Sequence, residues 1–254
     1  MSKLPKEHKF LDLSDYGRPI AKVIARSLKN TRATPIDVTI SFVISGLIGL
    51  MFIAFEIYWA AGFFLVVKSI LDAADGELAR IKNTPSYTGR FLDSISDILL
   101  NLLLFMMIVW VSNTHIILGI AAFLCMQLQG TLYNYYYTIL RSQMDGDTTS
   151  RIFENEIPTA FPGEQQKHVT FMYIFYRILY GGFDRLIYTL DFSASTGRPL
   201  PNWFMTVLSI FGLGFQLLLI SVLLIAGLKD YVVIIIIAMT LLLPVFIGVR
   251  KYRG

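Results

Sequence analysis

The chain contains 254 residues, of which 55% are hydrophobic and only 16% are charged, and its formal net charge at pH 7 is +4. This balance excludes an ordinary soluble domain and indicates an integral membrane protein. Its long, continuous apolar runs favour membrane-spanning helices over the alternating strands of a barrel. A single cysteine, Cys125, excludes an intrachain disulfide.

An amphipathic helix is predicted near the N-terminus. The apolar residues Ile20, Val23, Ile24 and Leu28 recur at helical spacing among lysines and arginines. A helix of this kind suits an anionic membrane surface. We therefore assign residues 1–33 to a cytoplasmic amphipathic arm, for which a solvated basic arm is the alternative.

Six membrane-spanning helices are predicted, at about twenty residues for each span. They cover residues 38–58, 60–79, 91–111, 116–140, 203–228 and 231–249. These spans form an all-α membrane domain over residues 34–254, with a long cytoplasmic or interfacial connection at 142–201. In that connection, residues 169–190 are expected to form an interfacial helix that Gly181 and Gly182 can break, because the charges there argue against a seventh span.

Basic residues set the predicted orientation of these spans. All lysines and arginines except Lys68 and Lys229 lie on one side of the proposed topology. The positive-inside rule then places that side, together with both termini, in the cytoplasm.

Four aspartates stand at the junction of the second and third predicted spans. Asp72 and Asp75 are three residues apart, and Asp93 and Asp97 are four apart, so each pair shares one helical face. Charges are costly at such positions, and carboxylate oxygens suit Mg²⁺ or Mn²⁺. Two such ions could neutralise a pyrophosphate during displacement at phosphorus. The chain is therefore predicted to be a membrane enzyme acting on a phosphate-bearing substrate.

From the first of these aspartates to the last, the sequence reads D-x2-D-G-x2-A-R-x8-G-x3-D-x3-D. This pattern resembles the motif of the CDP-alcohol phosphotransferase (CDP-alcohol phosphatidyltransferase) family. The resemblance implies that Asp72, Asp75 and Asp93 bind metal, and that Asp97 is the general base and a further metal ligand.

The same resemblance implies a CDP pocket lined by Gly76, Ala79, Arg80 and Gly89. The residue types agree with this role, because glycine lets a phosphate approach the backbone closely and arginine can bind two phosphate oxygens at once. The implied reaction is the attack of an alcohol on the phosphorus distal to cytidine, with release of CMP. A homodimer is implied as well.

CDP-diacylglycerol with a small polar alcohol is the favoured substrate pair, and membrane lipids rather than nucleic acid are the expected partners. Transfer from CDP-choline or CDP-ethanolamine to a lipid hydroxyl would use the same motif. A membrane prenyltransferase is a second enzyme alternative, although its aspartate motifs lie farther apart. A divalent-cation transporter is the alternative from a different class, since carboxylates can also line an ion path.

Lys68 is a further candidate, because it lies one turn before Asp72 on the same predicted face. It can pair with a carboxylate, hold a substrate phosphate or make a structural contact only.

Overall fold

The computed structural model describes residues 9–144, 156–197 and 199–253, and every regular element within them is helical. The α-helices are α1 (Arg18–Leu28), α2 (Pro35–Ala54), α3 (Tyr58–Lys82), α4 (Tyr87–Ser112), α5 (Ile116–Gln143), α6 (Gln166–Leu190), α7 (Asn202–Leu208), α8 (Leu213–Ile225), α9 (Val232–Met239) and α10 (Leu242–Arg253). Four 3₁₀ turns join them, η2 (Leu13–Asp15), η3 (Phe192–Thr196), η4 (Ser209–Phe211) and η5 (Lys229–Tyr231). The predicted all-α class is confirmed. Residues 1–8 of the predicted arm and residues 145–155 of the predicted connection lie outside the described residues.

Several helices are long and apolar enough to cross a membrane, which confirms an integral membrane protein. They are α2, α4, α5 and the stretch Lys229–Tyr252, and the bent pair Asn202–Phe211 and Leu213–Ile225 is a fifth if it counts as one span. The remaining predicted span is α3, in which Lys68, Asp72 and Asp75 interrupt the apolar sequence. The number six therefore stays a prediction.

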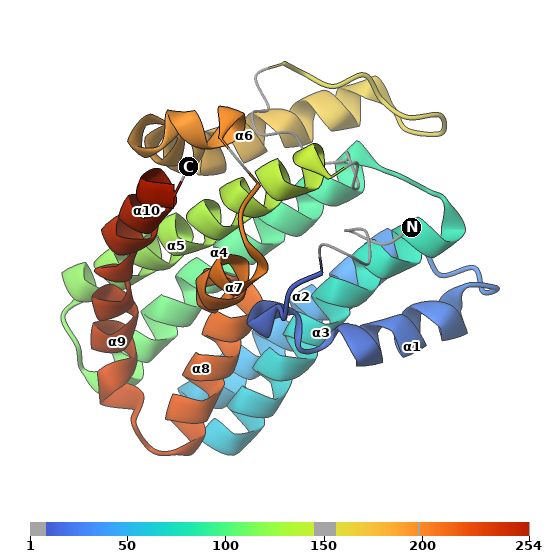
Figure 1. Cartoon of the computed structure of the whole chain (residues 1–254). Coiled ribbons are helices and arrows are strands. Elements are labelled where there is room, and N and C mark those ends of the chain that lie inside the picture. The colour runs from blue at the N-terminus through green and yellow to red at the C-terminus, as the bar shows by residue number, and fades with distance from the viewer. Residues whose placement is uncertain (1–8, 145–155, 198, 254) are drawn as a thin grey trace.

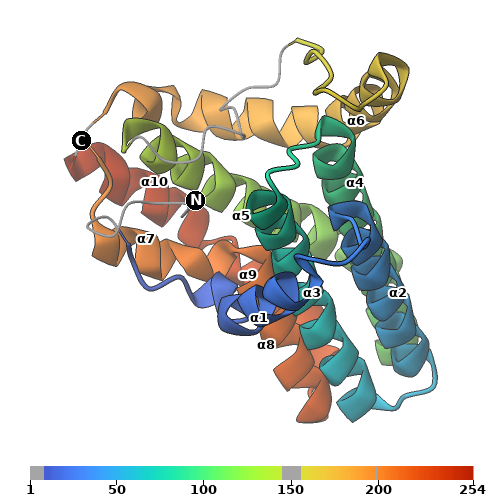
Figure 2. The same cartoon turned by 90° about the vertical axis from the view of Figure 1, so that its right-hand side faces the viewer.

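The bundle is arranged around α3. Helix α2 packs along one side of α3 and α8 along another, while α4 packs against α2 and α5 (Figures 1 and 2). Residues from six helices meet in the main apolar core, where Phe42, Leu104, Phe105 and Ile220 are fully or almost fully buried. Burial of such side chains stabilises a fold by about 1.5–3 kcal/mol each in water.

Helix α6 lies beside α4 and α5 (Figures 1 and 2) and is not a candidate span. It is continuous through Gly181 and Gly182, so the break that the sequence allowed there is wrong. Contacts on both sides of the two glycines hold the helix: Tyr180 donates a hydrogen bond to the carbonyl of Ser94, and Ile187 is fully buried.

The predicted continuous helix 203–228 is also wrong, because α7 and α8 meet at an angle of 52°. The N-terminal turn η2 fills the bend. A Cβ on Gly214 would collide with the carbonyl oxygen of Ser14, and a Cβ on Gly212 would collide with the Cβ of Ser14. The amide of Leu13 donates to Ser209 Oγ at 2.9 Å. The bend therefore forms around a segment that is distant in sequence.

The predicted helix 231–249 is interrupted between α9 and α10. Pro244 explains the interruption, since proline has no amide hydrogen for the carbonyl of Thr240 and its ring clashes with that carbonyl. Gln129 of α5 supports this region: its side-chain amide donates to Ile236 O at 2.8 Å and to Thr240 Oγ1 at 2.7 Å. Such bonds matter because lipid offers no hydrogen bonds to freed backbone groups.

Helix α1 forms where the amphipathic helix was predicted. Its small residues Ala21 and Ala25 are buried against Leu78 and neighbouring residues of α3. Ile20 and Val23 remain exposed, with exposed fractions of 54% and 63%. An exposed apolar pair beside basic residues suits a membrane surface.

We predict that Gly214→Ala lowers the melting temperature of the detergent-solubilised protein, because the added Cβ collides with Ser14. Overpacking of this kind costs about 1–3 kcal/mol. Limited proteolysis should also cut the N-terminal segment faster. Gly248→Ala is the matched control, because a Cβ at that exposed position of α10 meets no atom within 4 Å. Equal melting temperatures for both variants would contradict the role given to η2.

Candidate metal and phosphate site

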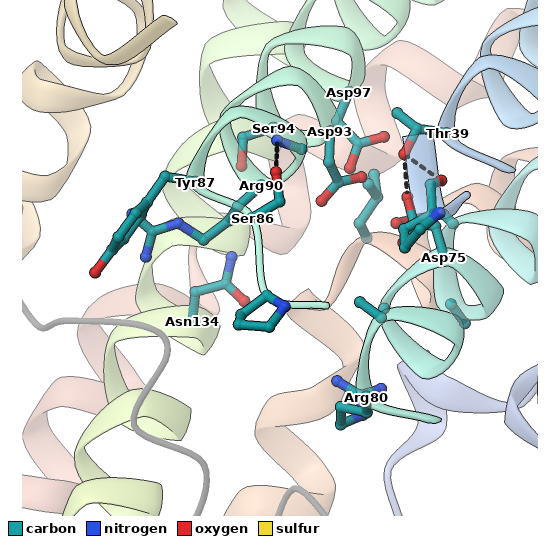
Figure 3. A pocket seen from close by; sticks show the side chains of 18 of the residues that line it. Thr39, Asp75, Arg80, Ser86, Tyr87, Arg90, Asp93, Ser94, Asp97 and Asn134 are labelled. Atoms are coloured by element: carbon teal, nitrogen blue, oxygen red, sulfur yellow. Dashed lines mark hydrogen bonds between the residues drawn. The ribbon is translucent and has the colours of Figure 1, made fainter. Parts of the chain in front are cut away.

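A cleft of about 1200 Å³ opens within the bundle, and all eight residues that the sequence assigned to a site line it. They are Asp72, Asp75, Gly76, Ala79, Arg80, Gly89, Asp93 and Asp97. The first five come from α3 and the last three from α4. Figure 3 shows Asp93 and Asp97 extending from one helix toward Asp75 on the other. Because α2 packs against both helices, it fixes the separation of the two walls.

Three of the carboxylates form a compact group. Asp72, Asp75 and Asp93 each offer one oxygen, and these oxygens lie within 4.8 Å of one another. Asp93 Oδ1 is buried and has no hydrogen-bond partner in the described part of the chain. Three carboxylates this close repel one another unless a cation lies between them. The donor set and the unpartnered oxygen therefore fit a divalent cation with a preference for oxygen ligands.

Thr39 of α2 supports this group, as its hydroxyl donates to Asp75 Oδ2 at 2.6 Å (Figure 3). Both side chains are buried. An outer hydrogen bond of this kind fixes the orientation of a ligating carboxylate. Sequence reasoning gave Thr39 no role, because no local spacing connects it to Asp75 on another helix.

Asp97 lies outside the compact group and is paired with Lys68, whose role the sequence left open. Lys68 is only 1% exposed. Its ammonium forms an ion pair with Asp97, and its Nζ lies 3.9 Å from Asp72 Oδ2. Of the roles considered, the structure therefore favours pairing with carboxylates.

Arg80 is oriented by a chain of charges that begins in the N-terminal arm. Its Nη2 lies 3.2 Å from Glu77 Oε1, and the same oxygen accepts a hydrogen bond from Arg18, which also pairs with Asp15. A Cβ on Gly76 would lie 3.6 Å from the Arg80 guanidinium, so the glycine leaves that side of the arginine open. The three-residue spacing of Glu77 and Arg80 could have indicated this pair, but the contact with Arg18 has no sequence signal.

The first turn of α4 is capped by Ser86, which directly precedes it, and by Glu164, which is distant in sequence. Ser86 Oγ accepts a hydrogen bond from the amide of Gly89 at 2.8 Å, as an N-cap residue does. Glu164 accepts three further bonds, from Ser86 Oγ at 2.8 Å and from the amides of Tyr87 at 3.1 Å and Thr88 at 2.8 Å. These bonds satisfy backbone donors that a helix start leaves open. They hold the segment around residue 164 at the rim of the cleft.

The same bonds set the ionisation of Glu164. Partial burial by itself raises the pKa of this carboxyl, but the hydrogen bonds from Thr88, Ser86 and Tyr87 outweigh burial and lower the pKa below the ordinary value of 4.5. The carboxylate is therefore the form that holds α4 at neutral pH.

Aromatic and charged side chains line the remaining wall. Tyr176, Tyr180 and Asp184 reach the cleft from α6, and Arg90 and Arg141 reach it from α4 and α5. The sequence placed α6 at the membrane interface and assigned none of these three residues of α6 to the site. A helix joined by a long connection can approach any neighbour, so no pattern in its own sequence identifies that neighbour.

The family model for CDP-alcohol phosphatidyltransferase matches residues 35–242 of the chain. No curated protein sequence matches the chain. The matched region runs from the first residue of α2 to the first residue of α10 and includes all four aspartates. It leaves out α1 and η2.

We predict that Thr39→Val weakens divalent-cation binding while the fold is kept, because valine has nearly the same shape but cannot donate to Asp75. Loss of an outer hydrogen bond to a metal ligand costs about 10–100-fold in affinity. Mn²⁺ titration followed by electron paramagnetic resonance (EPR) measures the change. Ser41→Ala is the control on the same helix, since that hydroxyl bonds to the backbone of Asp37. Unchanged Mn²⁺ affinity in Thr39→Val would remove Thr39 from the site.

We predict that Glu164→Gln increases hydrogen exchange at the amides of Tyr87 and Thr88 by about tenfold at pH 7, as expected for loss of a charged hydrogen-bond acceptor. Because the pKa of Glu164 is lower in the folded protein than 4.5, the stabilisation that its carboxylate gives to the start of α4 is complete above pH 4.5. This stabilisation disappears as the pH falls through the folded-state pKa. In the wild-type protein, the protection of the two amides from hydrogen exchange should therefore fall only below pH 4.5. The exposed Glu156→Gln is the control, and equal exchange in both variants would refute the cap.

Proposed function

Because the chain belongs to the CDP-alcohol phosphatidyltransferase family, we propose that it transfers a phosphatidyl group from CDP-diacylglycerol to a small polar alcohol and releases CMP. Transfer of a phosphatidyl group from a CDP-linked donor follows from the family, and the particular donor and acceptor are our proposal. The observation that carries it is the group of Asp72, Asp75 and Asp93, which lines the same cleft as an oriented Arg80.

The three grouped carboxylates would hold Mg²⁺ or Mn²⁺. When bound, the cation neutralises negative charge on the pyrophosphate and on the leaving oxygen. Thr39 orients the Asp75 ligand, and the unpartnered Asp93 Oδ1 is available for coordination. The sequence expectation that Asp97 is also a ligand stays a prediction.

Arg80 would bind the pyrophosphate by donating two hydrogen bonds to its oxygens. Glu77 holds the guanidinium in place, and Gly76 leaves space for the phosphates beside the α3 backbone. Ala79 and Gly89 line the same cleft and contribute little volume. We therefore assign these small residues to the walls of the cytidine pocket.

Asp97 would act as the general base. It accepts the proton of the acceptor hydroxyl as that oxygen forms a bond to the phosphorus distal to cytidine. The bond from this phosphorus to the bridging oxygen breaks, and CMP leaves with the bonding electrons. Lys68 fixes the Asp97 carboxylate for this step through their ion pair. Proton transfer requires Asp97 within hydrogen-bond reach of the bound alcohol.

We place the cleft at the cytoplasmic side of the membrane, as the distribution of lysine and arginine predicts. Arg80, Lys82 and Arg90 lie at the α3–α4 junction beside the cleft, and α1 adds further basic residues. In this orientation the lipid donor enters from the bilayer and a soluble alcohol enters from the cytosol. We also expect a homodimer, as the family resemblance implies.

The reaction is tested by CMP release from purified protein in detergent with Mg²⁺. CDP-diacylglycerol is supplied with serine, glycerol phosphate or inositol phosphate in turn, and chelation by EDTA should stop the reaction. Release that depends on one of these alcohols would support the proposal and identify the acceptor. Release only with CDP-choline or CDP-ethanolamine and diacylglycerol would contradict the proposed donor. No CMP from any pair would contradict the proposed activity.

We predict that Asp97→Asn binds CDP-diacylglycerol with nearly wild-type affinity but loses at least 100-fold in kcat, because loss of a general base costs about 10²–10⁴-fold. Asp230→Asn is the control, since this aspartate is exposed in η5, away from the cleft. CMP release at the wild-type rate by the Asp97 variant would remove this residue from the mechanism.

A further inference from the structure

Lys68 is a buried cation that contacts two carboxylates of the cleft. Its side chain extends from α3, forms an ion pair with Asp97 of α4, and brings Nζ to 3.9 Å from Asp72 Oδ2. The ammonium also lies 4.9 Å from the centre of the Phe42 ring on α2. It therefore occupies the space that joins Asp72 to Asp97.

That space is where a second cation would have to bind. The motif suggested four metal ligands, but only Asp72, Asp75 and Asp93 have oxygens within 4.8 Å of one another. A second divalent ion would need Asp97, together with a carboxylate shared with the first ion. Asp97 is instead bound to Lys68. A divalent ion at this position would also face the positive ammonium at short range, which is unfavourable in a site of low dielectric constant.

On the side of the apolar core, Lys68 has almost no space into which it could withdraw. A void of only about 10 Å³ lies beside it, bordered by apolar side chains that include Leu100, Leu104 and Leu217. A void of this size holds one water molecule at most. An ammonium that left Asp97 for this region would lose its ion pair without gaining hydration. The ammonium therefore stays with the carboxylates and does not withdraw into the core.

We propose that Lys68 takes the place of a second metal ion, so that the chain binds one divalent cation, at Asp72, Asp75 and Asp93. The ammonium supplies the second positive charge and holds Asp97 in position. This inference rests on the proposed function only for what the bound ion does in the reaction. The number of bound ions can be measured without turnover.

The experiment counts Mn²⁺ ions on the full-length protein in detergent. EPR measures free Mn²⁺ during a titration, with and without CDP-diacylglycerol in the micelles, and also reports magnetic coupling between neighbouring ions. We expect one Mn²⁺ per wild-type chain in both conditions, without coupling between two ions. In Lys68→Met, which keeps an unbranched side chain one atom shorter and removes its charge, we expect two Mn²⁺ per chain with a coupled signal.

Lys82→Met is the matched control, because Lys82 lies on the same helix but donates to the carbonyls of Thr31 and Ala33. It should bind one Mn²⁺. Two ions or none on the wild-type chain would overturn the proposal, and so would a single ion on a folded Lys68→Met protein. If Lys68→Met does not fold, the wild-type stoichiometry and coupling decide the question. An inactive protein with one bound Mn²⁺ would contradict the proposed function but leave this inference intact.

Discussion

The structure depends on the requirement that buried carboxylates have cationic or hydrogen-bonding partners. Removing a carboxylate from water is costly unless its charge is compensated. Asp75 receives a hydrogen bond from Thr39, and Asp97 receives the ammonium of Lys68. Asp93 Oδ1 receives nothing from the described chain. The helices therefore supply partners for Asp75 and Asp97, and the positive charge that Asp93 still needs would come from a bound cation.

The sequence predicted this site because its main residues depend on helix geometry alone. Spacings of three and four residues place Asp72 with Asp75, and Asp93 with Asp97, on single faces whatever the surrounding fold. One short connection then brings both faces to the same end of the bundle. The positions of α2, α4 and α5 were predicted from the sequence as well, since long apolar segments specify spans independently of their neighbours.

Features that depend on contacts between distant segments could not be predicted. The bend between α7 and α8 forms around Ser14, about two hundred residues earlier in the chain. Glu164 caps a helix that begins 77 residues before it. In both cases the local sequence allows several structures, and tertiary packing selects one. Pro244, by contrast, carried a local signal for an interruption that the predicted spans did not include.

The cleft has two parts, the carboxylates on α3 and α4 and the rim around them, and the two parts are held by different contacts. The carboxylates stand on α3 and α4, which share α2 as a support, so their separation changes little without disrupting the bundle. The rim is built from η2, the segment around Glu164 and α6, which are other elements than the two helices that carry the four aspartates. Of these, η2 also precedes the region that the family model matches. Because substitutions at the rim leave the carboxylates in place, we expect the choice of acceptor alcohol to be determined there, while the transfer chemistry depends on the shared helices.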